Sequence, residues 1–297
     1  MHTPVLLKEV IEGFNPKENQ NYIDCTLGEG GHSLEILKHI LPEGKLLGID
    51  FDQRNIDFVR NRFNEAGIEE KNFMLTSDNF KNLKSIVEKN KFNNISGILF
   101  DLGLNSYFLD ESKRGFSFRF NEFLDMRFDE KLVVTAYDVV NTFSEDKIES
   151  ILSELGEEGF SKNIAKEIVK SRKNQEIKTT YDLNEIVFKS TPKWYQHRKI
   201  HPSTKTFMAL RIYVNQEIEN LKTAISDACN LVSKNGRVAI ISFHSLEDRI
   251  VKNYFKELVA SKEFRVINKK TIIPKWTEVK QNKRSRSAKL RIIEKII

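Results

Sequence analysis

Residues 22–50 have the sequence YIDCTLGEGGHSLEILKHILPEGKLLGID. The apolar run at 22–27 ends in a glycine-rich turn and predicts a strand, and residues 46–49 predict a second strand. A strand, a helix and a strand in this order form the crossover unit of a parallel sheet. Between the two strands, apolar residues recur at helical spacing: Leu34, Ile36, Leu37 and Ile40.

The same alternation continues to residue 103. Helical spacing over residues 56–63 precedes an expected strand at 73–76, a helix near 80–90 and a strand at 95–100. We therefore predict an α/β fold with a Rossmann-like, mostly parallel, doubly wound sheet, whose ligands bind at the carboxyl ends of the strands. Four distinctive residues fall at those ends: Gly28, Asp50, Asp78 and Asp101.

After Asp101 the alternation stops. Residues 105–200 contain aromatic-rich loops and helical patterns near 145–172 and 180–189, without a convincing strand. We predict that this stretch is an inserted helical domain that recognises the substrate. Residues 1–104 and 201–297 then form the core domain.

The α/β pattern resumes after the insertion. The pattern predicts a long helix over residues 203–233, a strand at 237–243 and a helix at 246–260. Two β-rich stretches, 264–267 and 290–293, close the chain, and we predict no helix in the polar, basic loop that joins them. A terminal antiparallel hairpin is the natural interpretation.

The composition favours a cytoplasmic protein with a polyanionic partner. Lys and Arg number 48 against 42 Asp and Glu, a net charge of +6 that favours nucleic acid without requiring it. Cys25 and Cys229 lie far apart, so neither a disulfide framework nor a zinc site is predicted. The first residues lack the pattern of an export or transit signal, and no apolar run reaches the length of a membrane helix. We expect a soluble protein of the reducing cytoplasm with no membrane partner.

The turn after the first strand predicts a cofactor site. Gly28, Gly30 and Gly31 allow backbone amides to approach a ligand at the start of a helix, and three glycines exceed what simple chain reversal needs. Asp50 ends the second strand, where a carboxylate accepts hydrogen bonds from ribose hydroxyls. This geometry suits a nicotinamide dinucleotide and S-adenosylmethionine alike.

Three features favour S-adenosylmethionine. The dinucleotide fingerprint requires a third glycine where this chain has Ser33. Asp24 can pair with an ammonium group, which nicotinamide dinucleotides lack. The terminal hairpin is more typical of methyltransferase sheets than of dehydrogenase sheets. Phe80, after the third strand, is a candidate for packing on the adenine, with a role in the core as the alternative.

Distinctive motifs extend from the first residues to the last strand. Besides the glycine turn, they are HTPVLL (2–7), DLGL (101–104), RGFSF (114–118), LDMR (124–127), HP (201–202), ALRI (209–212), ISFHSLEDR (241–249) and RSRSAKLR (284–291). This set resembles the motifs of the bacterial ribosomal RNA small-subunit methyltransferase H family, also known as MraW. The likeness covers the whole chain.

The resemblance implies S-adenosylmethionine-dependent N4-methylation of a cytidine in the decoding region of 16S ribosomal RNA, within the small ribosomal subunit. The family usually has Gln where this chain has Phe108, and serines where it has Asn105 and Ser106. A Gln amide can hydrogen-bond the cofactor, whereas Phe108 can only pack. Carried over by motif, the implied cofactor contacts are Gly30, Gly31, His32, Asp50, Phe80, Asp101 and Phe108.

Methylation of a cytosine amine depends on positioning and proton removal, because the nitrogen lone pair is delocalised into the ring. Asp101 and Asn105 are candidate catalytic acceptors for this amine, with pure cofactor binding as the alternative for Asp101. Carbon-5 methylation needs a cysteine nucleophile in a flexible loop. Cys25 and Cys229 fall in a predicted strand and a predicted helix, so we reject that chemistry.

His244 is a third candidate catalytic residue. The pattern places it at the carboxyl end of the strand at 237–243, on the same rim as the glycine turn, and a satisfied surface histidine is the alternative. Glu247, Asp248 and Arg249 follow in the first turn of a helix. For them, capping the helix and acting at the site are equal alternatives.

Two basic stretches are candidate RNA-binding surfaces. Residues 280–291 include six cationic residues, and we prefer contact with rRNA phosphates to an ordinary solvated loop. Around residues 193–205, cations alternate with Trp194 and Tyr195, which suits single-stranded RNA with a splayed base.

Two other functions stay open, an amino methyltransferase acting on DNA or a small molecule and a non-catalytic RNA-binding factor of ribosome assembly. The sequence predicts no metal site and indicates no oligomeric state.

Overall fold

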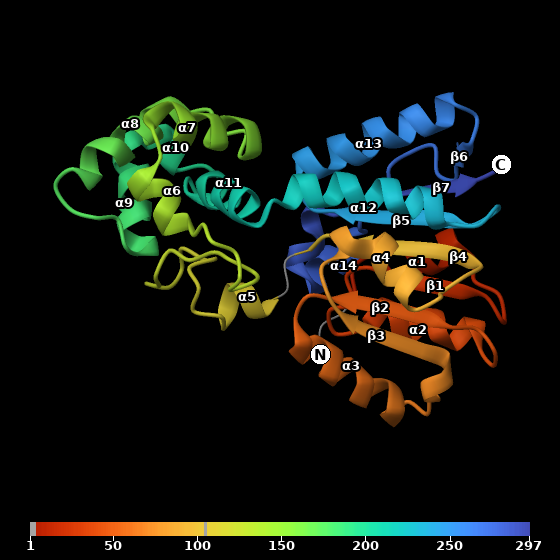
Figure 1. Ribbon diagram of the computed structural model, residues 1–297. Coiled ribbons are helices and arrows are strands. Elements are labelled where there is room, and N and C mark those ends of the chain that lie inside the picture. The colour runs from red at the N-terminus through yellow and green to blue at the C-terminus, as the bar shows by residue number, and fades with distance from the viewer. Residues whose placement is uncertain (1–3, 104–105) are drawn as a thin grey trace. The chain divides into compact units, whose positions relative to one another are not determined.

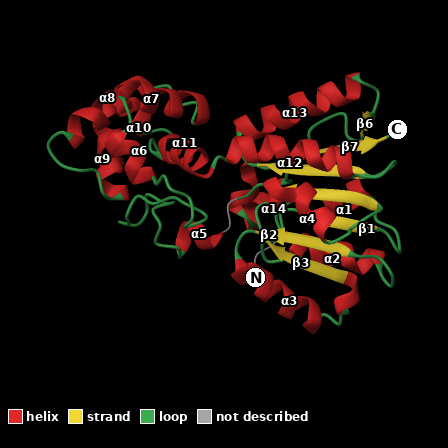
Figure 2. Ribbon diagram, in the orientation of Figure 1, coloured by secondary structure: helices red, strands yellow, loops and turns green. Residues whose placement is uncertain are grey.

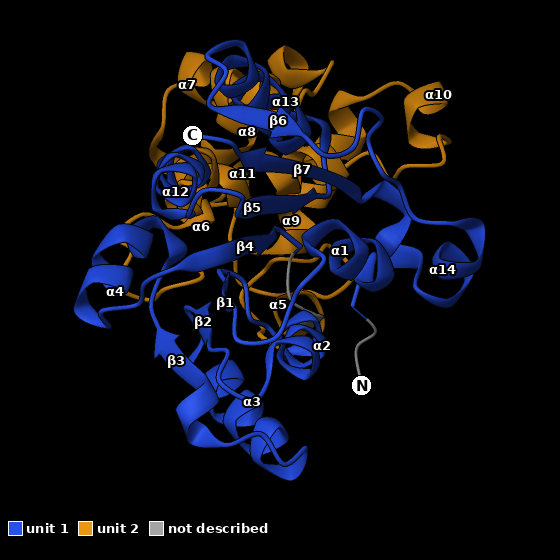
Figure 3. Ribbon diagram, turned by 90° about the vertical axis from the view of Figure 1, so that its right-hand side faces the viewer, with its two compact units in different colours: residues 1–103, 219–297 blue, residues 104–218 orange. Residues whose placement is uncertain are grey.

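The computed structural model describes residues 4–103 and 106–297. They form two compact units, which are described separately and coloured in Figure 3. Unit 1 consists of residues 1–103 and 219–297, and unit 2 of residues 104–218.

Unit 1 is built on one sheet of seven strands, which confirms the predicted α/β class (Figure 1). The strand order is β3-β2-β1-β4-β5-β7-β6, with parallel pairing from β3 to β5. β7 is antiparallel to both β5 and β6, so the predicted terminal hairpin is confirmed. The strands are β1 (Asn21–Asp24), β2 (Leu46–Asp50), β3 (Phe73–Ser77), β4 (Ile95–Asp101), β5 (Arg237–Ser242), β6 (Phe264–Val266) and β7 (Lys289–Lys295).

Helices cover both faces of this sheet (Figure 2). Apolar side chains of α4, α12 and α13 enclose one core cluster on the sheet, and those of α1, α2 and α3 enclose a second. Among the residues described, no helix has the length and apolar character needed to cross a membrane. The helices and 3-10 turns are α1 (Leu7–Phe14), α2 (Gly31–Ile40), α3 (Gln53–Glu65), η1 (Glu70–Asn72), η2 (Phe80–Asn82), α4 (Leu83–Lys89), α12 (Glu217–Leu231), α13 (Ser245–Ala260), α14 (Trp276–Gln281) and η4 (Lys283–Ser287).

The strand order places a topological switch point between β1 and β4. From β1 the chain proceeds to β2 and β3 on one side, then returns to add β4 and β5 on the other. Ligands of open α/β sheets bind where the connections diverge in this way, at the carboxyl ends of the strands. Asp24 ends β1 and Asp101 ends β4, so both residues lie at this position.

Unit 2 is helical, with apolar residues of α6, α8, α9 and α11 meeting an aromatic-rich loop in its core. Among its described residues, Phe123 and Thr179 form an isolated antiparallel β-bridge. The helices are α5 (Ser106–Asp110), α6 (Ala136–Thr142), α7 (Glu145–Ser150), the π-helical turn η3 (Ile151–Leu155), α8 (Ser161–Arg172), α9 (Thr180–Ser190), α10 (Lys193–Gln196) and α11 (Thr204–Asn215).

The predicted single helix over residues 203–233 is wrong. The chain forms α11 and α12 instead, separated by Gln216, whose φ of 52° is left-handed. Arg211 donates two hydrogen bonds to the Glu217 carboxylate, at 2.8 and 2.9 Å, which stabilises a break that no Gly or Pro marks. Because α11 packs in the core of unit 2, that unit extends to residue 218, beyond the end at 200 that the pattern predicts.

The connection between β6 and β7 also differs from the prediction, because it contains α14 and η4. η4 is capped locally, since Asn282 Oδ1 accepts a hydrogen bond from the Arg284 N–H at 3.1 Å. Helices of five or six residues are too short to leave a periodic apolar pattern in the sequence.

Candidate functional site

Glycines shape the turn after β1. Gly30 has a φ of 72°, and a Cβ atom at this position would lie 2.9 Å from both Val59 methyl carbons. Glycine alone suits both the left-handed backbone and this space. α2 begins at the next residue, Gly31, so the N–H groups of its first turn, which lack partners within the helix, lie at this turn.

Asp50 connects the end of β2 to the same turn. Its Oδ2 accepts a hydrogen bond from the Gly28 N–H at 2.8 Å, and its Oδ1 accepts one from the Asp52 N–H at 2.9 Å. Burial raises the pKa of Asp50 to about 6, although these two bonds oppose the shift. Each carboxylate oxygen has a second lone pair. Asp50 therefore holds the turn and retains acceptor capacity for a ribose hydroxyl.

Asp24 lies beneath the turn, with only 1% of its surface exposed. Its Oδ2 accepts a hydrogen bond from the Ser33 hydroxyl at 2.7 Å, and its Oδ1 accepts one from the Thr26 N–H at 3.1 Å. Burial raises the pKa of Asp24 against the effect of these bonds. In the sequence Ser33 stands out only as a missing glycine, and its contact with Asp24 becomes visible only in the fold. The pairing of Asp24 with a cofactor ammonium stays a prediction.

His32 and Asp101 come together at the switch point. His32 Nε2 lies 3.6 Å from Asp101 Oδ2. Within the described part of the chain, both ring nitrogens of His32 and Oδ1 of Asp101 are buried without a hydrogen-bond partner. The Asp101 N–H donates to Thr26 Oγ1 at 2.6 Å, which holds the end of β4 against the turn after β1. Because unpartnered buried polar atoms are costly and rare, this pair suits the polar groups of a ligand.

Two aromatic candidates make core contacts. Phe80 is half-buried at the start of η2, and its ring lies edge-on to Phe100 with centroids 5.9 Å apart. Phe108 is 3% exposed and contacts two other phenylalanine rings of unit 2 at 5.1 Å. Both rings stabilise a core, and their expected contacts with a cofactor stay predictions. Asn105 lies outside the described residues.

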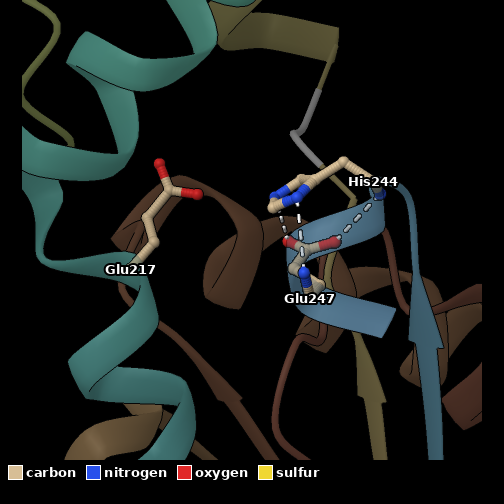
Figure 4. A group of neighbouring side chains, drawn as sticks. All are labelled: Glu217, His244 and Glu247. Carbon is tan, nitrogen blue, oxygen red and sulfur yellow. Dashed lines mark hydrogen bonds and ion pairs between the residues drawn. The ribbon is translucent and has the colours of Figure 1, made fainter. Parts of the chain in front are cut away.

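His244 is the N-cap residue of α13 (Figure 4). Its Nδ1 accepts a hydrogen bond from the Glu247 N–H at 3.4 Å, while Glu247 Oε2 accepts one from the Phe243 N–H at 2.8 Å. Of the two alternatives for Glu247, the structure shows capping. Nε2 of His244 lies 3.1 Å from Glu247 Oε1 but has no partner of hydrogen-bonding geometry among the described residues. The catalytic role of His244 stays a prediction.

Asp248 binds two cations of β7. Lys289 Nζ lies 3.0 Å from its Oδ2, and Arg291 Nε lies 2.8 Å from its Oδ1. Burial opposes ionisation of this carboxyl, but the two cations lower its pKa. Two of the six cationic residues in 280–291 are therefore paired inside unit 1, with a carboxylate that offsets one of their two charges.

The stretch at 193–205 in unit 2 is partly structural. The Tyr195 hydroxyl donates to the buried Glu158 carboxylate at 2.8 Å. The His201 ring stacks on a phenylalanine ring with centroids 4.2 Å apart. Trp194 is 64% exposed and presents its ring to solvent.

The turn after β1, Asp50 and the pair of His32 and Asp101 thus lie at one edge of the sheet of unit 1. The turn offers backbone donors, Asp50 offers acceptors, and the pair offers polar atoms that lack hydrogen-bond partners among residues 4–103 and 106–297. These groups can hold a ligand that carries a ribose and charged ends, and a carboxylate among them can accept a proton.

Comparison with known sequences finds relatives of this chain. The family described as "MraW methylase family" matches residues 1–296. A protein named "Ribosomal RNA small subunit methyltransferase H" from Clostridium botulinum (strain Kyoto / Type A2) is 45% identical over 99% of both chains. Proteins of the same name from Clostridioides difficile (strain 630) and Sulfurihydrogenibium sp. (strain YO3AOP1) are 42% and 43% identical, also over 99% of both chains.

Proposed function

The chain belongs to the MraW methylase family, and from this premise we propose that it methylates the N4 amine of a cytidine in the decoding region of 16S ribosomal RNA. It is an S-adenosylmethionine-dependent ribosomal RNA methyltransferase, and its full-length relatives are named ribosomal RNA small subunit methyltransferase H. The observation that carries the proposal is the pair of His32 and Asp101 at the switch point, beside the glycine turn, whose buried side-chain atoms have no hydrogen-bond partner in the described part of the chain.

The residues at this edge fit S-adenosylmethionine. When bound, the cofactor supplies an electrophilic methyl group on a sulfonium. Asp50 would accept hydrogen bonds from the ribose hydroxyls, and the N–H groups of the first turn of α2 would attract a carboxylate. Phe80 would pack beside the adenine. The proposed cofactor residues are Asp24, Gly28, Gly30, Gly31, His32, Asp50, Phe80 and Asp101.

Asp101 is the proposed acceptor for the target amine. Its Oδ1 has no partner among the described residues, so it can accept a hydrogen bond from an amine N–H. This bond orients the nitrogen, and the same oxygen takes the proton that the nitrogen must lose when it gains a methyl group. The Thr26 hydroxyl accepts a hydrogen bond from the Asp101 N–H and so holds the end of β4 in place, while His32 Nε2 lies 3.6 Å from Oδ2.

The state of the cysteines supports amine chemistry over carbon-5 methylation. Cys25 and Cys229 are both buried, at 2% and 3% exposure. Burial raises the pKa of Cys25 well above its ordinary value and that of Cys229 to about 12. A nucleophilic cysteine must be reachable and must ionise near neutral pH. Both thiols therefore fit a structural role.

Labelled S-adenosylmethionine tests the substrate. The protein is incubated with small ribosomal subunits, naked 16S ribosomal RNA, and DNA. We expect label in ribosomal RNA and none in DNA. Label in DNA alone would identify an amino methyltransferase of another class.

Calorimetry tests the non-catalytic alternative. An RNA-binding assembly factor with a vestigial pocket would not bind S-adenosylmethionine. We expect binding by the wild-type protein and weaker binding by Asp50→Ala.

A further inference from the structure

The connection between β6 and β7 lies at the same edge of unit 1 as the proposed site. Asp101 pairs with Ile241 in β5, and Ser242, the next residue of β5, pairs with Lys289 at the start of β7. Because β7 runs antiparallel, the residues that precede Lys289 lie beyond the carboxyl end of β5. Only β5 separates β4 from β7, so the two strands are about 10 Å apart.

The connection is held in a defined conformation. Ile272 and Leu290 exchange two backbone hydrogen bonds, at 3.2 and 2.9 Å. Glu278 Oε1 accepts a hydrogen bond from the Leu6 N–H at 2.8 Å, which links α14 to the start of α1. The buried Ser285 hydroxyl donates to the Asn282 carbonyl at 2.8 Å. These bonds anchor both short helices of the connection.

The connection presents an aromatic ring to solvent. Trp276, the first residue of α14, is 73% exposed. Lys280, one turn later, places Nζ 5.5 Å from the centre of the Trp276 ring. Ile273, nearby in the chain, is 63% exposed. A tryptophan that has few neighbours and is approached by a cation leaves ring surface available for stacking.

The charge around this ring is strongly positive. Residues 268–288 contain one acidic residue, Glu278, and its Oε1 binds the Leu6 N–H. Lys289 and Arg291 share the single Asp248 carboxylate, which offsets one of their two charges, so most of the positive charge belongs to the connection itself. Seven cationic residues lie in it: Lys269, Lys270, Lys275, Lys280, Lys283, Arg284 and Arg286.

A pocket of about 260 Å³ opens between the connection and the end of β5. Arg286, Lys289 and the hydroxyl-bearing Ser245 and Ser287 supply its donors, and Pro274 with its neighbours supplies an apolar wall. No carboxylate is among the described residues that line it. Donors of this kind beside an apolar wall suit a phosphate and its ribose, and the volume is small for a larger ligand.

We propose that the connection between β6 and β7 binds the single-stranded RNA that flanks the target nucleotide, with Trp276 stacked on a base and the pocket at Arg286 holding a backbone phosphate. The proposal rests on the proposed function. Stacking rings combined with cations are the means by which proteins hold single-stranded nucleic acid. The position at the edge, one strand beyond Asp101, puts this surface beside the nucleotide to be methylated.

The chain offers an internal comparison, because it has two tryptophans. Trp194→Phe leaves Trp276 as the single tryptophan, and Trp276→Phe leaves Trp194, so that excitation selective for tryptophan reports one site at a time. Each variant is titrated with a single-stranded RNA of about twelve nucleotides. We expect the RNA to quench the fluorescence of Trp276. Quenching confined to Trp194 would overturn the proposal and assign the contact to the stretch at 193–205.

Affinity for the same RNA provides the second measurement. Trp276→Ala should weaken binding about 5- to 150-fold, whereas Trp276→Phe should restore most of it, because phenylalanine also stacks. Arg286→Ala should lower the slope of log affinity against log salt by about 0.7, the value for one phosphate on a single strand. Lys256→Ala on α13, about 18 Å along the helix from His244, is the matched control and should leave the pocket intact.

The outcomes separate the two claims. If the Trp276→Ala variant binds RNA with wild-type affinity, the stacking surface is refuted. If the Arg286→Ala variant keeps the wild-type salt slope, the phosphate pocket is refuted. The proposed function fails independently if the wild-type protein leaves small subunits unmethylated, whatever RNA the variants bind.

Discussion

Replacing Asp50 with Asn separates the charge of this residue from its shape. Asp50 accepts hydrogen bonds from the Gly28 and Asp52 N–H groups through its two oxygens. An Asn side chain keeps the volume and one acceptor oxygen but lacks the negative charge. We expect Asp50→Asn to fold and to bind S-adenosylmethionine more weakly at pH 7, because its bonds to the ribose hydroxyls are no longer charge-assisted.

The expected size follows from the pKa. Losing a charge-assisted bond costs about 1 to 3 kcal/mol, which is about 5- to 150-fold in Kd at pH 7. Burial raises the pKa of Asp50 to about 6, so at pH 5 the wild-type carboxyl is protonated in about ten molecules for each ionised one. The protonated carboxyl resembles the amide. The Kd ratio of variant to wild type should therefore shrink between pH 7 and pH 5, by about threefold if the carboxylate contributes about 5-fold and by about tenfold if it contributes about 150-fold.

Isothermal titration calorimetry at both pH values measures this ratio. Taking the ratio cancels titration of the cofactor and of Asp24, which are common to both proteins. Asp57→Asn is the matched control, since it removes a carboxylate from the exposed surface of α3. A ratio independent of pH would refute the carboxylate contact with ribose, and equal affinities at pH 7 would remove Asp50 from the site.

Further predictions concern stability, catalysis and RNA binding. Folding raises the pKa of Asp50 from 3.8 to about 6, so the folded protein holds the Asp50 proton more tightly than the unfolded chain does. The unfolding free energy should therefore fall by up to ~3 kcal/mol as the pH rises from about 4 to 6. Denaturant titration should show a smaller fall in Asp50→Asn. Ser33→Ala leaves the buried Asp24 carboxylate without one donor and should destabilise the protein by about 1 to 3 kcal/mol, and an unchanged denaturation midpoint would contradict this. Asp101→Ala should abolish methyl transfer, and its cofactor affinity reports whether the residue also holds the cofactor; wild-type turnover would exclude both roles. A triple variant that neutralises Lys283, Arg284 and Arg286 should lower the slope of log RNA affinity against log salt by about 2 and leave the cofactor affinity unchanged. An unaltered slope would show that residues 280–291 are a solvated loop.

The sheet could be predicted because its signals are local. The strands β1, β2 and β4 are short apolar runs that end at an Asp, and burial of Ile23, Leu47 and Ile98 agrees with this pattern. Asp50 and Asp101 follow from the same logic, since a carboxylate at the carboxyl end of a parallel strand lies where ligands bind.

What the sequence does not reveal depends on distant contacts. The break at Gln216 has no Gly or Pro to mark it and is held by side chains on either side. Asp248 pairs with residues of β7 more than forty positions away, so the sequence does not reveal that Lys289 and Arg291 share this carboxylate. Likewise, the donor role of Ser33 requires that α2 pack over the end of β1.

The position of the transferred methyl group tests the central claim most directly. Small ribosomal subunits methylated by the purified protein are digested, and the modified nucleotide is located and identified by mass spectrometry of the rRNA fragments. We predict N4-methylcytidine at one position of the decoding region with the wild-type protein and none with Asp101→Ala. A methyl group on carbon 5, on another base or outside the decoding region would contradict the account.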